Sequence, residues 1–199
     1  MQVFVSGIHT DIGKTIVSSI LVKSLNADYW KPVQAGGLSN TDADIVRKFN
    51  PNSKIFPSQY NLLNATSPHF AAIQENININ IEDFVFPNSE NLIIEGAGGL
   101  LSPLGNTFTN LDFIKFYKLP FVLVVKHYLG SITHTLSCLK IIENERLNFL
   151  GIIYVGNNEN LTEEFIDNYA TSKVLGRINI VDTITDNFIL QSSQYLKIF

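Results

Sequence analysis

Short apolar runs of strand length alternate along the chain with longer segments whose apolar positions recur at helical spacing. In several short runs, such as residues 121–125, the apolar residues are consecutive, which is typical of strands buried on both faces of a sheet. In the first helical segment, Val17, Ile20 and Leu21 form one apolar stripe because they lie three and four positions apart. Strands that alternate with helices predict an α/β fold: a doubly wound, mostly parallel sheet with helices on both faces.

The same pattern places the individual elements. We expect strands at residues 2–6, 29–33, 91–95, 121–126, 149–155 and 173–178. We expect helices at residues 14–25, 42–49, 111–117, 131–145, 163–169 and 184–196. The segment 50–88 is punctuated by Asn and Pro, and we expect loops there with one short helix after Pro68. With no internal repeat or linker, residues 1–199 are expected to form a single domain.

Composition narrows the possible partners. The 199 residues are 45% hydrophobic, which is enough for one sizeable core, and the net charge is −4. With 14 basic against 18 acidic residues, no basic field would attract nucleic acid or an anionic membrane. The single cysteine, Cys138, excludes an internal disulfide and reads as core packing. The first residues lack the features of a signal peptide and no apolar run could span a bilayer, so we expect a cytoplasmic protein.

A glycine-bounded loop follows the first strand and leads directly into a helix. It reads Gly7-Ile8-His9-Thr10-Asp11-Ile12-Gly13-Lys14-Thr15, a Walker A phosphate loop with one extra residue. Backbone N–H groups and the helix N-terminus form an anion cradle, Lys14 adds a charge at the outer phosphates, and the Thr15 hydroxyl can bind Mg²⁺. A simple turn before a surface helix is the alternative, which the order strand, loop and helix disfavours. The chain lacks the guanine-specific Asn-Lys-x-Asp motif, which favours ATP over GTP.

Four charged residues could complete a nucleotide site at the same edge. Glu95 ends a buried strand and precedes a glycine-rich turn, which is the Walker B arrangement, although a water-facing carboxylate is also possible. Lys31 ends the second strand, where a lysine could also pack its stem and reach water. Asp42 and Asp44 begin a predicted helix, where first-turn stabilisation alone would explain them. Ligands of open α/β sheets bind beyond the carboxyl ends of the strands, which favours a shared site.

Several motifs together resemble the dethiobiotin synthetase family, the ATP-dependent carboxylases of biotin biosynthesis. The residues that carry the resemblance follow in the family's order: 7–15, Lys31-Pro32-Val33-Gln34, Thr41-Asp42-Ala43, Thr66-Ser67-Pro68-His69, Glu95-Gly96-Ala97-Gly98-Gly99-Leu100 with Pro103-Leu104, and Leu129-Gly130-Ser131-Ile132 with His134. Beyond residue 150 only Leu175-Gly176 is similar.

The resemblance implies a Mg²⁺-dependent reaction with ATP and CO₂ as co-substrates. One amine of 7,8-diaminopelargonic acid becomes a carbamate, ATP phosphorylates it, and the second amine closes a cyclic urea. The resemblance assigns catalysis to Lys31, Lys14 and Thr10, and the metal to Thr15, Asp42 and Glu95. It assigns ATP binding to Asp11, Ile12, Gly13, Lys14, Thr15, Ile16, Asp42, Glu95, Gly96, Ala97, Gly98 and Asn157. It assigns the substrate to Lys31, Ala35 and Ser67, with Gly130, Ser131 and Ile132 contributed by the second subunit of a homodimer.

The chain departs from the family's pattern at three positions. Ala35 stands where relatives often carry Ser or Thr, and Thr133 stands where Asn is expected. Aligned without a gap, the family's adenine-reading Asn corresponds to Val155. We therefore expect Asn157, rather than Asn158, to read the base.

Two other functions fit parts of the sequence. A dimerising P-loop ATPase switch of the partitioning or cell-division type has a similar fold, but its loop usually carries a second lysine near the position of His9. An inactive paralogue is a further alternative, suggested by Ala35 and Thr133 and opposed by the intact Lys14 and Lys31. His9, His69, His127 and His134 lack metal-ligand spacing, and we expect them to be structural.

Overall fold

The computed structural model describes residues 1–170 and 172–196, and its centre is a seven-stranded sheet in the order β4-β2-β6-β1-β7-β8-β9. Every pairing in this sheet is parallel, as predicted. The strands are β1 (Gln2–Gly7), β2 (Asp28–Trp30), β4 (Ile55–Phe56), β6 (Leu92–Glu95), β7 (Phe121–Lys126), β8 (Phe149–Val155) and β9 (Val174–Ile178).

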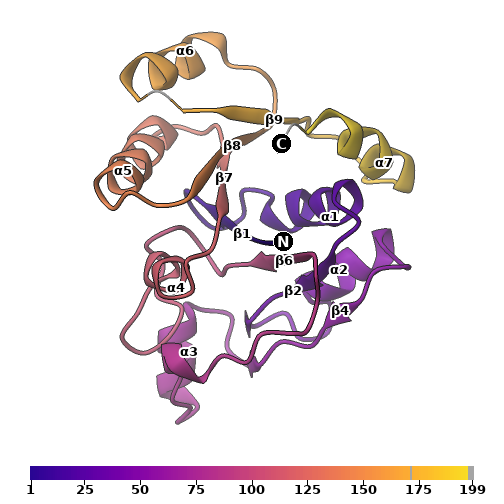
Figure 1. Ribbon diagram of the computed structural model, residues 1–199, viewed down its shortest axis with the longest axis vertical. Coiled ribbons are helices and arrows are strands. Elements are labelled where there is room, and N and C mark those ends of the chain that lie inside the picture. The colour runs from indigo at the N-terminus through magenta and orange to yellow at the C-terminus, as the bar shows by residue number, and fades with distance from the viewer. Residues whose placement is uncertain (171, 197–199) are drawn as a thin grey trace.

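Helices cover both faces of this sheet, which confirms the doubly wound arrangement (Figure 1). One face carries α1 (Lys14–Ser24), α2 (Asp42–Phe49) and α7 (Asp186–Tyr195). The other carries α4 (Asn110–Phe116), α5 (Ser131–Asn144) and α6 (Asn160–Tyr169). Among residues 1–170 and 172–196, no helix combines the length and the apolar character that crossing a membrane requires.

The strand expected at residues 29–33 is divided. The chain leaves the main sheet after Trp30, and β3 (Val33–Ala35) pairs with β5 (Tyr60–Leu62) in a separate two-stranded parallel sheet. Pro32, which has no N–H to donate, lies at the division, and its carbonyl accepts hydrogen bonds from the N–H groups of Gln59 and Tyr60 at 3.0 and 3.1 Å. Pro32 therefore marks the point where the chain leaves the main sheet and continues into the small two-stranded sheet.

The expectation of loops and one helix for residues 50–88 is wrong in part. The helix is present as α3 (Pro68–Gln74), but the segment also contains β4, β5 and a 3₁₀ turn, η1 (Ile81–Asp83). The two strands are two and three residues long, too short to show an alternating pattern in the sequence. β4 pairs with the edge of β2, and β5 pairs with β3.

The strand register brings the candidate residues to one edge. Val5 of β1 pairs with Glu95 of β6, and Trp30 of β2 pairs with Ile94 of the same strand. Because these strands are parallel, the loop after β1, Glu95 and the residue after Trp30 all lie at the carboxyl edge. The central strands β1, β6 and β7 are almost entirely buried, so the edge that carries the site is supported by the packed core.

Candidate functional site

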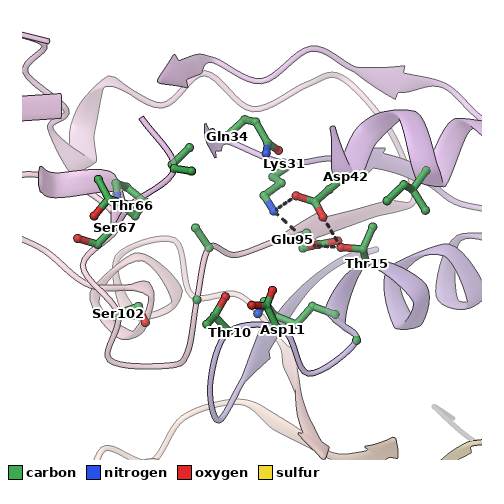
Figure 2. A pocket seen from close by; sticks show the side chains of 18 of the residues that line it. Thr10, Asp11, Thr15, Lys31, Gln34, Asp42, Thr66, Ser67, Glu95 and Ser102 are labelled. Atoms are coloured by element: carbon green, nitrogen blue, oxygen red, sulfur yellow. Dashed lines mark hydrogen bonds and ion pairs between the residues drawn. The ribbon is translucent and has the colours of Figure 1, made fainter. Parts of the chain in front are cut away.

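A cleft of about 840 Å³ opens at the carboxyl edge of the central strands (Figure 2). The phosphate loop, the ends of β2 and β3, the start of α2, the segment before α3 and the turn after β6 all contribute to it. The lining residues are Thr10, Asp11, Gly13, Lys14, Thr15, Ile16, Lys31, Gln34, Ala35, Asp42, Ile45, Ala65, Thr66, Ser67, Pro68, Glu95, Ala97, Gly98 and Ser102. Most residues predicted for catalysis, ATP and substrate thus meet in one cavity.

The phosphate loop leaves the N-terminus of α1 available to an anion. Gly13, the N-cap of α1, has φ 92° and provides no side-chain cap, so the first N–H groups of the helix remain free. A Cβ on Gly13 would lie 3.2 Å from Cγ1 of Val155, so glycine is also needed for close packing. The Lys14 ammonium donates to the His9 carbonyl at 3.1 Å and is held over the loop. Burial, aided by the Lys31 ammonium, lowers the pKa of Lys14 against the pull of Glu95 and Asp42.

Four side chains from four elements converge in the cleft (Figure 2). The Thr15 hydroxyl donates to Oδ1 of Asp42 and to Oε1 of Glu95, the latter at 3.0 Å. The Lys31 ammonium pairs with Oδ2 of Asp42 and lies 3.4 Å from Oε1 of Glu95. We name these four side chains, Thr15, Lys31, Asp42 and Glu95, the charged cluster.

The cluster shifts the protonation of its own members. Burial alone would lower the pKa of Lys31, but the Glu95 and Asp42 carboxylates outweigh burial and raise it. Burial alone would raise the pKa of Asp42, but the Lys31 ammonium and hydrogen bonds from Lys31 and Thr15 lower it. Lys31 is therefore held as a cation and Asp42 as an anion.

The donor set fits a magnesium ion carried by a nucleotide. Thr15, Asp42 and Glu95 offer hydroxyl and carboxylate oxygens, the ligands that Mg²⁺ prefers, and the Lys31 ammonium lies against both carboxylates. In residues 1–170 and 172–196 there is no group of three or more His, Cys, Asp or Glu that could hold a metal without other ligands. Two carboxylates and a hydroxyl suit a metal whose remaining ligands are water and substrate phosphates.

The turn after β6 is fixed from behind by Asn110, the first residue of α4. Its side-chain amide donates to the carbonyls of Ala97 and Gly99 at 2.7 and 2.8 Å. Gly96 does not line the cleft; a Cβ there would lie 2.6 Å from Oδ1 of Asn110, so its glycine is a packing requirement. Ala97 and Gly98 present the surface that faces the cleft.

The opposite wall of the cleft carries Ala35 and Ser67. The Ser67 hydroxyl is 3.0 Å from Nδ1 of His69, so a serine and a histidine form a hydrogen-bonded pair on this wall. Gly130, Ser131 and Ile132 do not line the cleft of their own chain. Gly130 is the N-cap of α5 with φ 100°, and the adjacent Leu129 is fully exposed.

A smaller cleft of about 210 Å³ adjoins the phosphate loop at Asp11, Ile12, Gly13 and Ile16. Apolar side chains from β8, β9 and the segment after β9 form most of its wall, together with Asn179. Asn157 is exposed and lines neither cleft, and its backbone carbonyl accepts a hydrogen bond from Arg177 at 3.1 Å.

Sequence reasoning missed several residues of the site. Gln34, Thr66 and Pro68 belong to the motifs but were not assigned to the cleft that they line, and Ser102 gave no signal. Tyr29 was also missed, although its hydroxyl donates to Oε2 of Glu95 at 3.0 Å. Tyr29 precedes Lys31 by two positions, and the two-residue period of a strand could have placed both on one face.

Comparisons with known proteins agree with this geometry. A family model described as an AAA domain matches residues 1–187. An ATP-dependent dethiobiotin synthetase BioD from Campylobacter jejuni strain 81-176 is 40% identical over 190 residues, covering 96% of this chain and 92% of its own length. A protein of the same name from Christiangramia forsetii is 42% identical over 178 residues, covering 88% of this chain and 86% of its own length.

Solved structures with low sequence identity share the fold. A ParA family ATPase from Chlorobium tepidum matches with a TM-score of 0.54 and 15% identity, covering 98% of this chain and 90% of that one. The septum site-determining protein MinD from Pyrococcus horikoshii, solved with Mg-ADP, matches with a TM-score of 0.55 and 14% identity, covering 96% and 86%. At this identity the likeness concerns the fold alone.

The charged cluster predicts how acid affects stability. Because the pKa of Asp42 is lowered in the folded chain, its ion pair contributes stability above the ordinary aspartate pKa of about 4, and this contribution is lost as the pH falls through the folded-state value. In Asp42→Asn the free energy of unfolding should fall less steeply with acid below about pH 4. Urea unfolding at a series of pH values measures this slope.

A matched control uses an aspartate outside the cleft. Asp182 is exposed and makes no ion pair with any other described residue, so Asp182→Asn should keep the wild-type slope. An Asp42→Asn slope equal to that of the wild type would contradict the assignment of this ion pair.

Proposed function

We propose that this chain converts 7,8-diaminopelargonic acid, CO₂ and ATP to dethiobiotin. The chain belongs to the family of ATP-dependent dethiobiotin synthetases and to the AAA-domain family. The observation that carries the proposal is the charged cluster facing the phosphate loop across one cleft, in a chain 40% identical to its relatives over nearly its whole length. The family consists of ATP-dependent enzymes that form C–N bonds. In this chain, one side of the cleft would bind the nucleotide and the other side the substrate.

The proposed reaction joins three substrates, and it brings two anionic groups, a carbamate and a triphosphate, into contact. One amine of the diamine takes up CO₂ as a carbamate, the carbamate oxygen attacks the γ-phosphorus of ATP and ADP leaves. The second amine then attacks the mixed anhydride, so that the cyclic urea forms and phosphate is released. A carbamate and a triphosphate repel each other, and the main task of the protein is to hold them together and to offset their charge.

Lys31 and Lys14 supply this positive charge from two sides of the cleft. Lys31 lies on the substrate side, and its raised pKa keeps it a cation, so its role is electrostatic and not that of a general base. Lys14 extends from the start of α1 over the phosphate loop, where its ammonium would face the outer phosphates of bound ATP. Thr10, also in that loop, lines the cleft and would lie close to the same phosphates.

The remaining contacts to ATP follow from the two clefts. The phosphates would lie on the N-terminus of α1, close to Ala97 and Gly98. Thr15, Asp42 and Glu95 would hold Mg²⁺, which when bound offsets charge on the phosphates. The base would enter the smaller cleft, where Asn179 offers an amide at the wall. Both Asn157 and Asn179 are exposed, but Asn179 lines the smaller cleft and Asn157 lines neither cleft, so we prefer Asn179 as the residue that reads the base.

The substrate would lie between Lys31 and Ser67, with its amines toward the phosphates. Ala35 offers no hydroxyl at this wall, which leaves its backbone and the Ser67 hydroxyl as polar groups. The family resemblance directs the substrate carboxylate to Gly130–Ile132 of a second subunit. These residues do not line the cleft of their own chain, and the exposed Leu129 beside them suits a subunit contact.

A location in the cytoplasm, where ATP is available, completes this proposal. The partitioning ATPases share the fold at 15% identity or less, which supports the alternative switch function less than the relatives at 40% identity support the synthetase.

The activity is tested directly with pure protein, 7,8-diaminopelargonic acid, bicarbonate, ATP and Mg²⁺. We expect dethiobiotin, detected by mass spectrometry, and phosphate release that depends on the diamine. ATP hydrolysis that ignores the diamine and yields no dethiobiotin would overturn the proposal. If such hydrolysis instead responded to DNA or vesicles, the switch function would replace it.

Replacement of Lys31 separates catalysis from nucleotide binding. In Lys31→Ala, kcat should fall by about 10²-fold or more because one preorganised positive charge is lost next to the reacting groups. ATP binding should remain measurable by calorimetry, since the phosphate loop is intact. The exposed Lys54 serves as control, and Lys54→Ala should keep wild-type turnover. Wild-type turnover in Lys31→Ala would remove Lys31 from the mechanism.

The proposed dimer is tested at Leu129. Leu129→Glu would place a charge on an exposed apolar side chain next to Gly130, and we expect it to shift the chain from dimer to monomer. The KM for the diamine should rise about 10-fold or more, while ATP binding is kept. Light scattering gives the mass. Leu161 on α6 is 83% exposed, and Leu161→Glu should leave both properties unchanged. A wild-type chain that is active as a monomer would contradict the shared site.

A further inference from the structure

We propose that Tyr29 is a positioning residue that holds one oxygen of Glu95 away from the cleft and thereby favours Mg²⁺ over Ca²⁺ at the site. This inference rests on the proposed function, because it concerns the metal that would accompany ATP. Tyr29 belongs to none of the motifs that carry the family resemblance.

The two oxygens of Glu95 face different surroundings. Oε2 accepts a hydrogen bond from the Tyr29 hydroxyl at 3.0 Å, and both residues are buried, with exposed fractions of 0% for Tyr29 and 1% for Glu95. Oε1 accepts from the Thr15 hydroxyl at 3.0 Å and lies 3.4 Å from the Lys31 ammonium. Oε2 of Glu95 therefore bonds to a buried side chain, whereas Oε1 faces the side chains of the cleft.

Strand geometry explains why Tyr29 reaches this carboxylate. β2 lies beside β6, and Tyr29 pairs with Ile93, two positions before Glu95. The phenol is long enough to bridge that offset along the strand. In this pair the Tyr29 hydroxyl is the donor and the Glu95 carboxylate oxygen is the acceptor. Without this hydroxyl, one oxygen of a buried carboxylate would lack a hydrogen-bond partner, which is unfavourable.

A carboxylate with one engaged oxygen discriminates between metals. Mg²⁺ demands a small, regular octahedron, takes few protein ligands and keeps several waters, whereas Ca²⁺ accepts more ligands and often both oxygens of a carboxylate. The Tyr29 hydrogen bond restricts Glu95 to one oxygen, Oε1, and also fixes the direction in which that oxygen points. Both effects favour the smaller ion. Outer partners of this kind commonly change metal affinity by about 10-fold to 100-fold.

The test measures binding and not turnover. Calorimetric titrations of ATP are made without metal, with Mg²⁺ and with Ca²⁺, on the wild type and on Tyr29→Phe, which keeps the ring and removes only the hydroxyl. We expect the ratio of the Mg²⁺-supported to the Ca²⁺-supported affinity to fall about 10-fold. Metal-free ATP binding should stay within about twofold, since the phosphate loop does not contact Tyr29.

A matched control comes from β8. Tyr154 is also fully buried, but its hydroxyl has no hydrogen-bond partner among the residues that the structure describes, and it lines neither cleft. Tyr154→Phe should leave all three affinities unchanged. A second measurement tests whether the effect of Tyr29 passes through Glu95: in a Glu95→Gln background the charge is gone, and adding Tyr29→Phe should no longer change the ratio.

Two results would overturn the proposal. One is an unchanged Mg²⁺ to Ca²⁺ ratio in Tyr29→Phe, and the other is a parallel loss of all three affinities, which would show a structural role only. Either result leaves the proposed function intact if the wild type forms dethiobiotin. If the wild type forms none while the ratio still responds, the synthetase activity fails and the role of Tyr29 stands.

Discussion

Burial of the Lys31 ammonium is the constraint on which the cleft depends. Its side chain is 9% exposed, and an unpaired ammonium at that depth would carry a desolvation penalty on the order of several kcal/mol. Asp42 from the start of α2 and Glu95 from the end of β6 offset this penalty, so three elements far apart in the sequence must meet at one point. The Thr15 hydroxyl donates to both carboxylates and ties the phosphate loop to the same point. The charges that stabilise this edge of the sheet are also those that a metal and a nucleotide require.

The parallel sheet makes this meeting possible because it brings the carboxyl ends of successive strands to one edge. β1 lies between β6 and β7, so the phosphate loop emerges next to Glu95. Behind the cleft, close packing leaves the loops little freedom. Gly13 fits against Val155, and Gly96 fits against Asn110 and Phe4. Rigid backbone supports the side chains that act by position and charge, which suits a reaction whose intermediates must be held together.

Much of this arrangement could be predicted from the sequence, because its signals lie within short contiguous segments. Consecutive apolar residues in strands 121–126 and 149–155 report burial on both faces, and β7 and β8 have those bounds. The phosphate loop is contiguous, so its role is contained in one segment.

The division of the strand at Pro32 has no local signal in the sequence. It depends on the pairing of β3 with β5, and α2 and β4 separate these two strands along the chain. The Tyr29 to Glu95 and Ser67 to His69 hydrogen bonds depend on side-chain direction across strands or turns, which residue type alone does not fix. The residues that line the smaller cleft could not be found by counting from one strand end, because they come from the phosphate loop, β8, β9 and the segment after β9.

The fold and the reaction are separable in this molecule. The fold is shared with the ParA and MinD structures at 14–15% identity, so the fold alone does not select a chemistry. Outside the phosphate loop, this chain places Lys31 after β2, Asp42 at the start of α2 and the Ser67–His69 pair before and within α3 at or beside the cleft. All of them lie in the segment between β2 and β6, which contributes one wall of the cleft and the small β3–β5 sheet. The proposed synthetase function depends on such a segment, because it adds a buried cation and a second wall to the cleft that the phosphate loop also lines. For this reason the substitutions that test the reaction belong on that wall, and those that test nucleotide binding belong on the loop.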